Sequence, residues 1–112
     1  MKRKILIVED NVGLSQMQKD WLAQAGYDAV TAMNEPIARS LIRRTQFDLI
    51  LSDVRLPEGD GISLLEWLRK ERKDIPFILT TEYAGKTPAQ KLEEVRRIME
   101  EKGAKAHVLS DL

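Results

Sequence analysis

The chain has 112 residues, of which 18 are Lys or Arg and 18 are Asp or Glu, so its formal net charge is zero. This length fits one domain, and the neutral balance argues against a nucleic-acid-binding protein that works through bulk positive charge. The absence of cysteine excludes disulfides, thiolate metal ligands and a cysteine nucleophile. We therefore expect a single soluble domain over residues 1–112, cytoplasmic, with no membrane segment and no direct contact with nucleic acid.

The first half of the chain alternates short apolar runs with amphipathic stretches. Residues 5–8 form a continuous β-branched run, typical of a strand buried on both faces and too short for a signal peptide or a membrane span. Asn11 can cap a helix that runs to Ala25, and residues 27–32 predict a weaker strand. A second helix is expected after Asn34. Apolar residues at helical spacing are Leu14, Met17, Trp21 and Ala25 in the first helix, and Ile37, Ala38, Leu41 and Ile42 in the second.

The second half repeats the same alternation. Residues 49–51 and 77–79 read as buried strands, and the segment 53–60 contains Pro and Gly and predicts a loop. A highly charged helix is expected over 87–102, followed by a short fifth strand over 106–109. Apolar residues that line the helix after the loop are Ile62, Leu65 and Leu68, and the charged helix is expected to turn Leu92, Val95 and Met99 inward.

Strands that alternate with helices predict an α/β fold, a doubly wound parallel sheet of five strands with helices on both faces and right-handed crossovers. The flavodoxin-like strand order 2-1-3-4-5 places the first and third strands side by side. We expect no helix after the fifth strand, because the sequence stops at Leu112. One side of strands four and five should then expose apolar surface, which favours a homodimer, cover by a partner chain, or a C-terminally truncated piece of a longer regulator.

Carboxylates follow two of the predicted strands. Glu9 and Asp10 come directly after the first strand, and Asp53 follows the third. In the 2-1-3-4-5 order these three side chains converge, and two like charges at 4 Å repel by about 4 kcal/mol at an effective dielectric near 20. Either a proton is taken up or a cation binds, and an oxygen-only ligand set favours Mg²⁺. The simpler alternative is that Glu9 and Asp10 are loop acids, with Asp10 or Asn11 capping the helix.

The segments 5–11 and 48–61 resemble the receiver domain of two-component response regulators. The similarity runs from Met1 to Thr81 and includes the acid pair, an Asp at the phosphoacceptor position, Pro57 four residues later and Gly61 eight residues later. The string Asp-Val-Arg-Leu-Pro from Asp53 is similar to receivers of the nitrogen-regulator type. A receiver is a signalling phosphoacceptor and not an enzyme in the ordinary sense, since at most it catalyses its own phosphorylation and dephosphorylation.

The resemblance implies a role for each matching residue. Asp53 would accept a phosphoryl group from a sensor histidine kinase or a phosphotransfer protein. Asp10 and Asp53 would hold Mg²⁺, with Glu9 acting through water and the backbone carbonyl of Arg55 completing the shell. The Thr81 hydroxyl would then donate to a phosphoryl oxygen.

In a receiver, a conformational switch transmits the phosphorylation state to the output. His107 falls at the position of the switch aromatic on strand five. The output would be carried by an output domain or by a partner protein.

The similarity weakens after Thr81. Glu82 stands where receivers place a small residue, and Ser110 stands where they carry a lysine that bonds the acceptor Asp and the phosphoryl group. Losing a charge-assisted hydrogen bond of this kind costs about 1.5–3 kcal/mol. The alternative within the family is therefore an atypical receiver that binds partners independently of phosphorylation.

Two alternatives from other classes are weaker. An aspartyl-phosphate hydrolase needs a general acid two residues after its nucleophile, where this chain has Arg55, which does not give up its proton. A flavodoxin-like FMN carrier needs hydrogen-bond donors in its first loop, where Glu9 and Asp10 would repel the phosphate.

Overall fold

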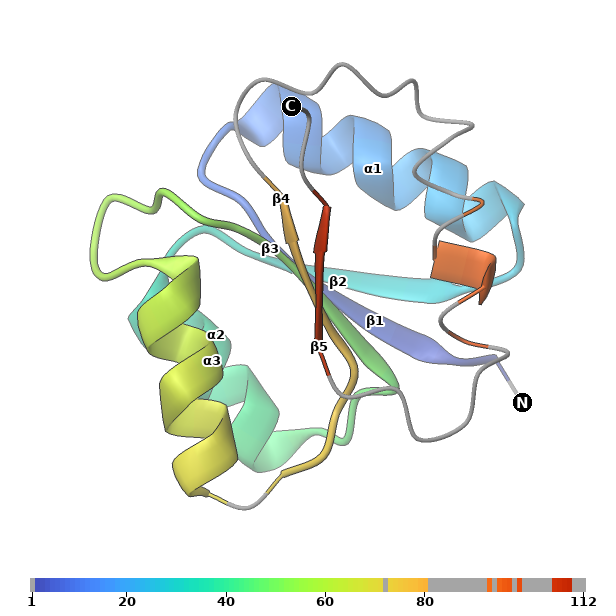
Figure 1. The fold of residues 1–112 in the computed structure, drawn as a ribbon. Helices are drawn as coiled ribbons and strands as arrows, with labels where there is room; N and C mark the ends of the chain where they lie inside the picture. Colours follow the sequence, from blue (N-terminus) through green and yellow to red (C-terminus); the bar gives the residue numbers. More distant parts are fainter. Residues whose placement is uncertain are drawn as a thin grey trace.

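The computed structural model describes residues 2–71, 73–80, 93, 95–97 and 99, and the backbone of 106–109. Within these residues strands and helices alternate along the chain (Figure 1). The elements are β1 (Lys4–Val8), α1 (Val12–Gln24), β2 (Asp28–Ala32), α2 (Glu35–Arg44), β3 (Leu49–Asp53), α3 (Gly61–Lys70), β4 (Phe77–Thr80) and β5 (Ala106–Leu109).

The five strands form one parallel sheet in the order β2-β1-β3-β4-β5, which confirms the predicted doubly wound, flavodoxin-like arrangement. In the registers, Val8 pairs with Ser52, and Asp53 pairs with Thr80. The carboxyl ends of β1, β3 and β4 therefore meet at the same edge of the sheet. This edge is where an open α/β sheet binds its ligands.

Helices cover both faces of the sheet, with α1 and the helical residues 95–97 on one side and α2 and α3 on the other (Figure 1). Successive strand residues point to opposite faces, so β1 supplies Ile5 and Ile7 to one core cluster and Leu6 and Val8 to the other. Val95 and Met99 are buried in the first cluster, as predicted for the charged helix. The ends of that helix lie outside the described residues.

The predicted helix faces needed correction at three positions. The apolar spacing grouped Met17, Ile37 and Ile62 with the apolar faces of their helices, but their side chains are 45%, 42% and 49% exposed. In α1 the sheet-facing line is rotated by about one residue, because small and polar side chains take part in it. Buried residues of these helices are Ser15, Gln18 and Leu22 in α1, Glu35, Ala38 and Ile42 in α2, and Gly61, Leu64 and Leu68 in α3. The Ser15 hydroxyl donates to the Val12 carbonyl at 3.1 Å, which satisfies its buried polar group.

Two further expectations concern a membrane-spanning helix and the segment after β5. Among the described residues, no helix has the length and apolar character needed to cross a membrane. The expectation that no helix follows β5 concerns residues 110–112, which lie outside the described residues.

Candidate functional site

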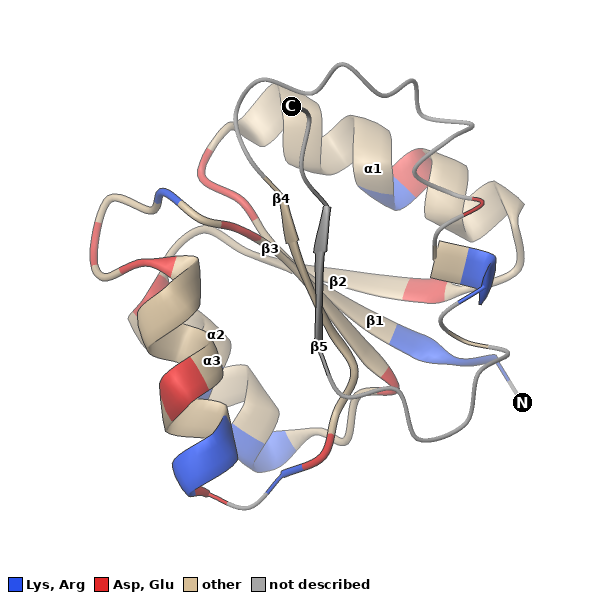
Figure 2. Ribbon diagram, viewed as in Figure 1, with Lys and Arg blue, Asp and Glu red and all other residues tan. Residues whose placement is uncertain are grey.

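Three carboxylates gather at the carboxyl edge of the sheet. Glu9 and Asp10 lie on the connection between β1 and α1, and Asp53 is the last residue of β3. One carboxylate oxygen from each side chain lies within 4.8 Å of the others. Figure 2 shows acidic segments on the β1–α1 connection and at the end of β3, on the same side of the molecule. The sequence-predicted cluster is therefore present, and Glu9 and Asp53 are almost fully buried in it while Asp10 is exposed.

The loop after β1 is fixed by backbone contacts. The Glu9 amide donates to the Ala32 carbonyl at 2.9 Å, which extends the pairing of β1 with β2. Asn11 caps α1, since its side-chain oxygen accepts from the Leu14 amide at 2.9 Å. The helix cap is thus Asn11 and not Asp10, so the Asp10 carboxylate is available to the cluster.

Burial and like charge act together on Glu9. They raise the pKa of its carboxyl group from 4.5 to about 7, mainly because burial disfavours the ionised form and also because the negative charges of Asp53 and Asp10 lie close. A hydrogen bond from the Asn11 amide to Glu9 Oε2, 3.1 Å long, favours the ionised form and partly offsets the rise. A cation bound among the three side chains would remove this penalty.

Asp53 is held at the point where β3 becomes a loop. Its carboxylate Oδ1 accepts from the Arg55 amide at 3.4 Å, and its carbonyl accepts from the Ser52 hydroxyl at 2.9 Å. The following residue, Val54, donates its amide to the Thr80 carbonyl at 3.0 Å. A side chain at Gly61 would run into the Asp53 carbonyl and approach Leu79 Cδ2 to 2.8 Å. The spacing that puts glycine eight residues after Asp53 therefore has a direct steric reason.

The loop 54–60 closes on itself beside Asp53. Arg55 and Asp60 form an isolated antiparallel bridge, and the Gly61 amide donates to the Val54 carbonyl at 2.9 Å. Asp60 then caps α3 by accepting from the Ser63 amide at 2.6 Å. These contacts set the course of the backbone at Arg55, whose carbonyl the resemblance assigns to a metal shell.

The remaining predicted residues lie at the edge of the described structure or outside it. The Thr80 hydroxyl donates to the Ser52 carbonyl at 3.4 Å, and thus bonds the backbone of β3. His107 pairs with Ile78 in the backbone register of β5. The side chain of His107 lies outside the described part of the structure. The same holds for three whole residues, Thr81, Glu82 and Ser110.

The donor set at this edge consists of hard oxygen ligands. Carboxylate oxygens select hard cations such as Mg²⁺, and the cluster of Glu9, Asp10 and Asp53 offers one from each side chain. Glu9 and Asp53 are both buried, and the pKa of the Glu9 carboxyl group is raised, so a divalent cation bound here would offset the repulsion between the carboxylates.

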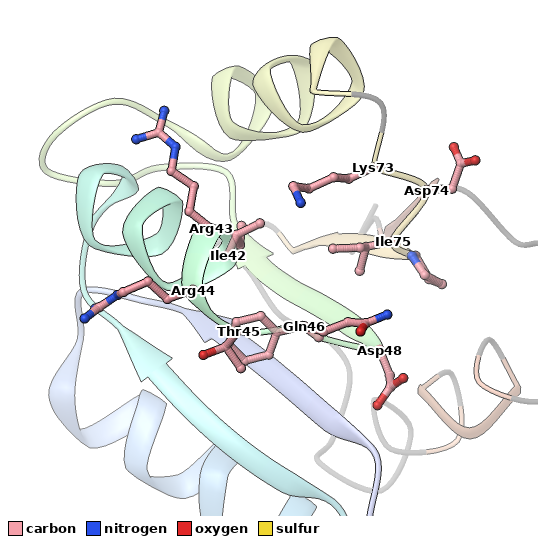
Figure 3. A pocket seen from close by; sticks show the side chains of 11 residues that line it. Ile42, Arg43, Arg44, Thr45, Gln46, Asp48, Lys73, Asp74 and Ile75 are labelled. Atoms are coloured by element: carbon pink, nitrogen blue, oxygen red, sulfur yellow. The ribbon is translucent and has the colours of Figure 1, made fainter.

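A separate hollow of about 540 Å³ lies at the opposite, amino end of the strands (Figure 3). Its wall comes from the segments 42–48 and 73–76, which connect α2 to β3 and lead from α3 into β4. Figure 3 shows the Arg44 guanidinium and the Asp74 carboxylate pointing away from the hollow. The charged residues of its wall are Arg43, Arg44 and Lys73 together with Asp48 and Asp74, so the hollow has no convergent set of carboxylates for metal-assisted chemistry.

Sequence reasoning missed one buried charged residue near the site. Glu35 is the first residue of α2 and only 4% exposed. Its carboxylate pairs with Arg39 and accepts hydrogen bonds from the segment that follows Asp53. The only sequence signal was an acid in the first turn of a helix, a general preference that predicts no tertiary contact.

Comparison with known proteins agrees with this geometry. The family model of the response regulator receiver domain matches residues 5–106. The polar-differentiation response regulator DivK of Brucella anthropi is 32% identical over 96 residues, which cover 84% of this chain and 78% of DivK. The response regulator protein PilR of Pseudomonas aeruginosa is 33% identical over 84 residues, 75% of this chain, but the match spans only 19% of PilR.

Solved structures show the same fold. The non-phosphorylated HemR receiver domain of Leptospira biflexa is 36% identical, with a TM-score of 0.71 over 99% of this chain and 84% of that one. The response regulator protein TrrA of Thermotoga maritima, solved in complex with Mg²⁺ and BeF, is 26% identical, with a TM-score of 0.72 over 96% of this chain and 86% of that one.

Proposed function

Because this chain belongs to the response regulator receiver domain family, we propose that it is a phosphoacceptor of two-component signal transduction. In this proposal Asp53 accepts a phosphoryl group from a sensor histidine kinase or a phosphotransfer protein, with Mg²⁺ bound beside it. The observation that carries the proposal is the buried Asp53 carboxylate at the end of β3, with the carboxylates of Glu9 and Asp10 within 4.8 Å.

The metal would be held by the residues of that cluster. Asp10 and Asp53 would bind Mg²⁺ directly, Glu9 through water, and Arg55 through its backbone carbonyl. The bound ion supplies positive charge that offsets the charge of the phosphoryl oxygens as the nucleophile approaches. TrrA, in complex with Mg²⁺ and BeF, supports this choice of ion.

Asp53 would act as the nucleophile in its ionised form. One carboxylate oxygen forms a bond to phosphorus while the phosphorus–nitrogen bond of the donor phosphohistidine breaks, and the bonding pair leaves with the imidazole nitrogen. The Arg55 amide donates to Asp53 Oδ1 at 3.4 Å and so helps to orient the carboxylate. The chemistry of the chain would be confined to its own phosphorylation and dephosphorylation.

The response to phosphorylation would pass through β4 and β5. We assign the hydroxyl that donates to the phosphoryl group to Thr81 and the switch side chain to His107, both on the family pattern. An output domain or a partner protein would then recognise the altered surface, either on one chain or on a homodimer. The cytoplasm, where kinase and regulator meet, is the proposed location.

A second candidate function follows from Ser110, which stands where receivers carry a lysine. Without that charge-assisted contact, phosphorylation and conformational change would be more weakly coupled. The chain would then act as an atypical receiver, a protein-interaction module that works independently of phosphorylation.

The test is phosphorylation by acetyl phosphate in the presence of Mg²⁺, followed by measurement of the intact mass. We expect a single phosphoryl adduct that disappears with a chelator and in Asp53→Asn. Asp48→Asn is the matched control, since Asp48 is an exposed acid just before the amino end of the same strand. A folded wild-type protein that forms no adduct would contradict the phosphoacceptor function and leave the interaction module.

A further inference from the structure

Among the residues that the structure describes, Glu35 is the only buried Asp or Glu outside the acidic cluster. Its carboxylate forms an ion pair with Arg39, one turn further along α2. It also accepts hydrogen bonds from the Asp60 amide at Oε1, 3.1 Å, and from the Ser63 hydroxyl at Oε2, 3.2 Å. Hydrogen bonds to an ionised acceptor are about twice as strong as neutral ones. The Glu35 carboxylate is therefore held in place by protein groups and is not a solvated surface group.

Within the part of the chain that the structure describes, the hydrogen-bond partners of Glu35 outside its own helix belong to the segment 58–63. Besides Asp60 and Ser63, the Glu58 carbonyl accepts from the Glu35 amide at 3.3 Å. The backbone at Gly59 lies close against the Glu35 side chain, because a Cβ atom at this position would lie 2.9 Å from Glu35 Cδ. The φ angle of Gly59, +83°, also disfavours other residues. The end of the loop and the first turn of α3 are therefore built around one carboxylate from α2.

The anchored end of the loop is connected directly to the acidic cluster. Asp60, whose amide is bound by Glu35, forms the antiparallel bridge with Arg55. Arg55 in turn donates its amide to Asp53 Oδ1. The hydrogen bond from Asp60 to Glu35 is thus linked to the Asp53 carboxylate through two consecutive contacts, the bridge between Asp60 and Arg55 and the hydrogen bond from the Arg55 amide.

Arg39, which pairs with Glu35, is itself held by an aromatic ring. Its guanidinium lies over the Trp67 ring of α3, 5.2 Å from the ring centroid, and Arg43 lies at the same distance from that ring. The stacked arginine supplies the positive charge that a buried carboxylate requires. The contact of the two arginines with Trp67 also links α2 to α3.

We propose that Glu35 is a positioning residue for the phosphoacceptor site: it fixes the loop 54–60 in the shape that presents Asp53 and the Arg55 carbonyl to the bound cation. This role rests on the proposed Mg²⁺-dependent function. Glu35 itself touches neither the cation nor the phosphoryl group. Its removal should therefore weaken Mg²⁺ binding without abolishing the acceptor.

The test compares Glu35→Ala and Glu35→Gln with Glu58→Gln, a matched control because Glu58 is an exposed acid in the same loop. Mg²⁺ affinity is measured by calorimetric titration, and exchange of the Asp60 amide is measured in chelator. Removing a residue that supports a metal ligand typically weakens affinity 10-fold or more, so we expect about a 10-fold loss and faster amide exchange in Glu35→Ala. Glu35→Gln keeps one acceptor oxygen for Asp60 but loses the charge that pairs with Arg39, so it should recover only part of the affinity, whereas Glu58→Gln should match wild type.

The outcomes separate the two proposals. A folded Glu35→Ala protein with wild-type Mg²⁺ affinity would refute the positioning role, even if its stability falls, because a purely structural role lowers stability alone. If Glu35→Ala does not fold, Ser63→Ala removes a single hydrogen bond to Glu35 and should weaken Mg²⁺ binding about threefold. Unchanged affinity in that variant also refutes the role. A wild-type protein that binds no Mg²⁺ would overturn the Mg²⁺-dependent function itself.

Discussion

Replacing Glu9 by Gln should stabilise the metal-free protein above neutral pH while weakening its response to Mg²⁺. The pKa of the Glu9 carboxyl group is raised from 4.5 to about 7, first by burial and then by the charges of Asp53 and Asp10. Between these two values the folded protein keeps a proton that the unfolded chain has released. The free energy of unfolding must therefore fall as the pH rises through this range.

The size of the effect follows from the two pKa values. A rise from 4.5 to about 7 corresponds to a cost of about 3 kcal/mol once both states are ionised. Near pH 5.5 the cost is only about 1.4 kcal/mol, because the folded state is still protonated. Gln resembles the protonated Glu9 in shape and is neutral at every pH. The advantage of Glu9→Gln over wild type should thus grow by about 2 kcal/mol between pH 5.5 and pH 8.

The assay is urea unfolding of both proteins in chelator at these two pH values, repeated at pH 8 with saturating Mg²⁺. The ion should stabilise the wild type by about 2.7 kcal/mol at 100 times its dissociation constant, and Glu9→Gln by clearly less. Glu58→Gln controls for the loss of a surface charge. An advantage of Glu9→Gln that is the same at both pH values would refute the reasoning, because the raised pKa would then not be the cause.

Three further substitutions test how the fold supports the site, each by urea unfolding. Gly61→Ala should cost about 1–3 kcal/mol and disturb Asp53, because the new methyl group meets its carbonyl; a neutral effect would mean that the loop shifts freely. Asn34→Ala removes the cap that accepts from the Ile37 amide at 2.9 Å and should cost about 1 kcal/mol, with Mg²⁺ affinity unchanged. Phe77→Ala should cost about 3–5 kcal/mol, since the ring is fully buried; a loss below 1 kcal/mol would contradict the packing of β4.

The order of elements and the position of the acidic cluster could be predicted because both depend on local rules. A continuous apolar run such as residues 49–51 has few alternatives to a buried strand. Once the strands are parallel, their carboxyl ends share one edge, so Glu9 and Asp53 must approach each other although 44 positions separate them (53 − 9 = 44). The pairing of β1 with β3 supplied the remaining condition.

The features that could not be predicted depend on tertiary placement. Met17 fits the apolar spacing of α1 as well as Leu14 does, but the helix packs with Ser15 and Gln18 toward the sheet. Periodicity alone does not fix the rotation of a helix when its apolar stripe is short. Glu35 was missed because its hydrogen-bond partners, Asp60 and Ser63, lie after β3 in the sequence, and only the tertiary fold brings them next to α2.

The two buried glutamates of this domain show how differently burial of a carboxylate can be compensated. Glu35 has Arg39 beside it and accepts two hydrogen bonds from the loop and from α3, so its charge is satisfied by the protein itself. Glu9 accepts one hydrogen bond from the Asn11 amide, but two further carboxylates lie beside it, and its pKa is raised accordingly. A cation would lower the energy of the second arrangement and leave the first unchanged. If Mg²⁺ binds as proposed, stability should therefore depend on the ion through Glu9, whereas Glu35 should set how well the loop is shaped to receive it.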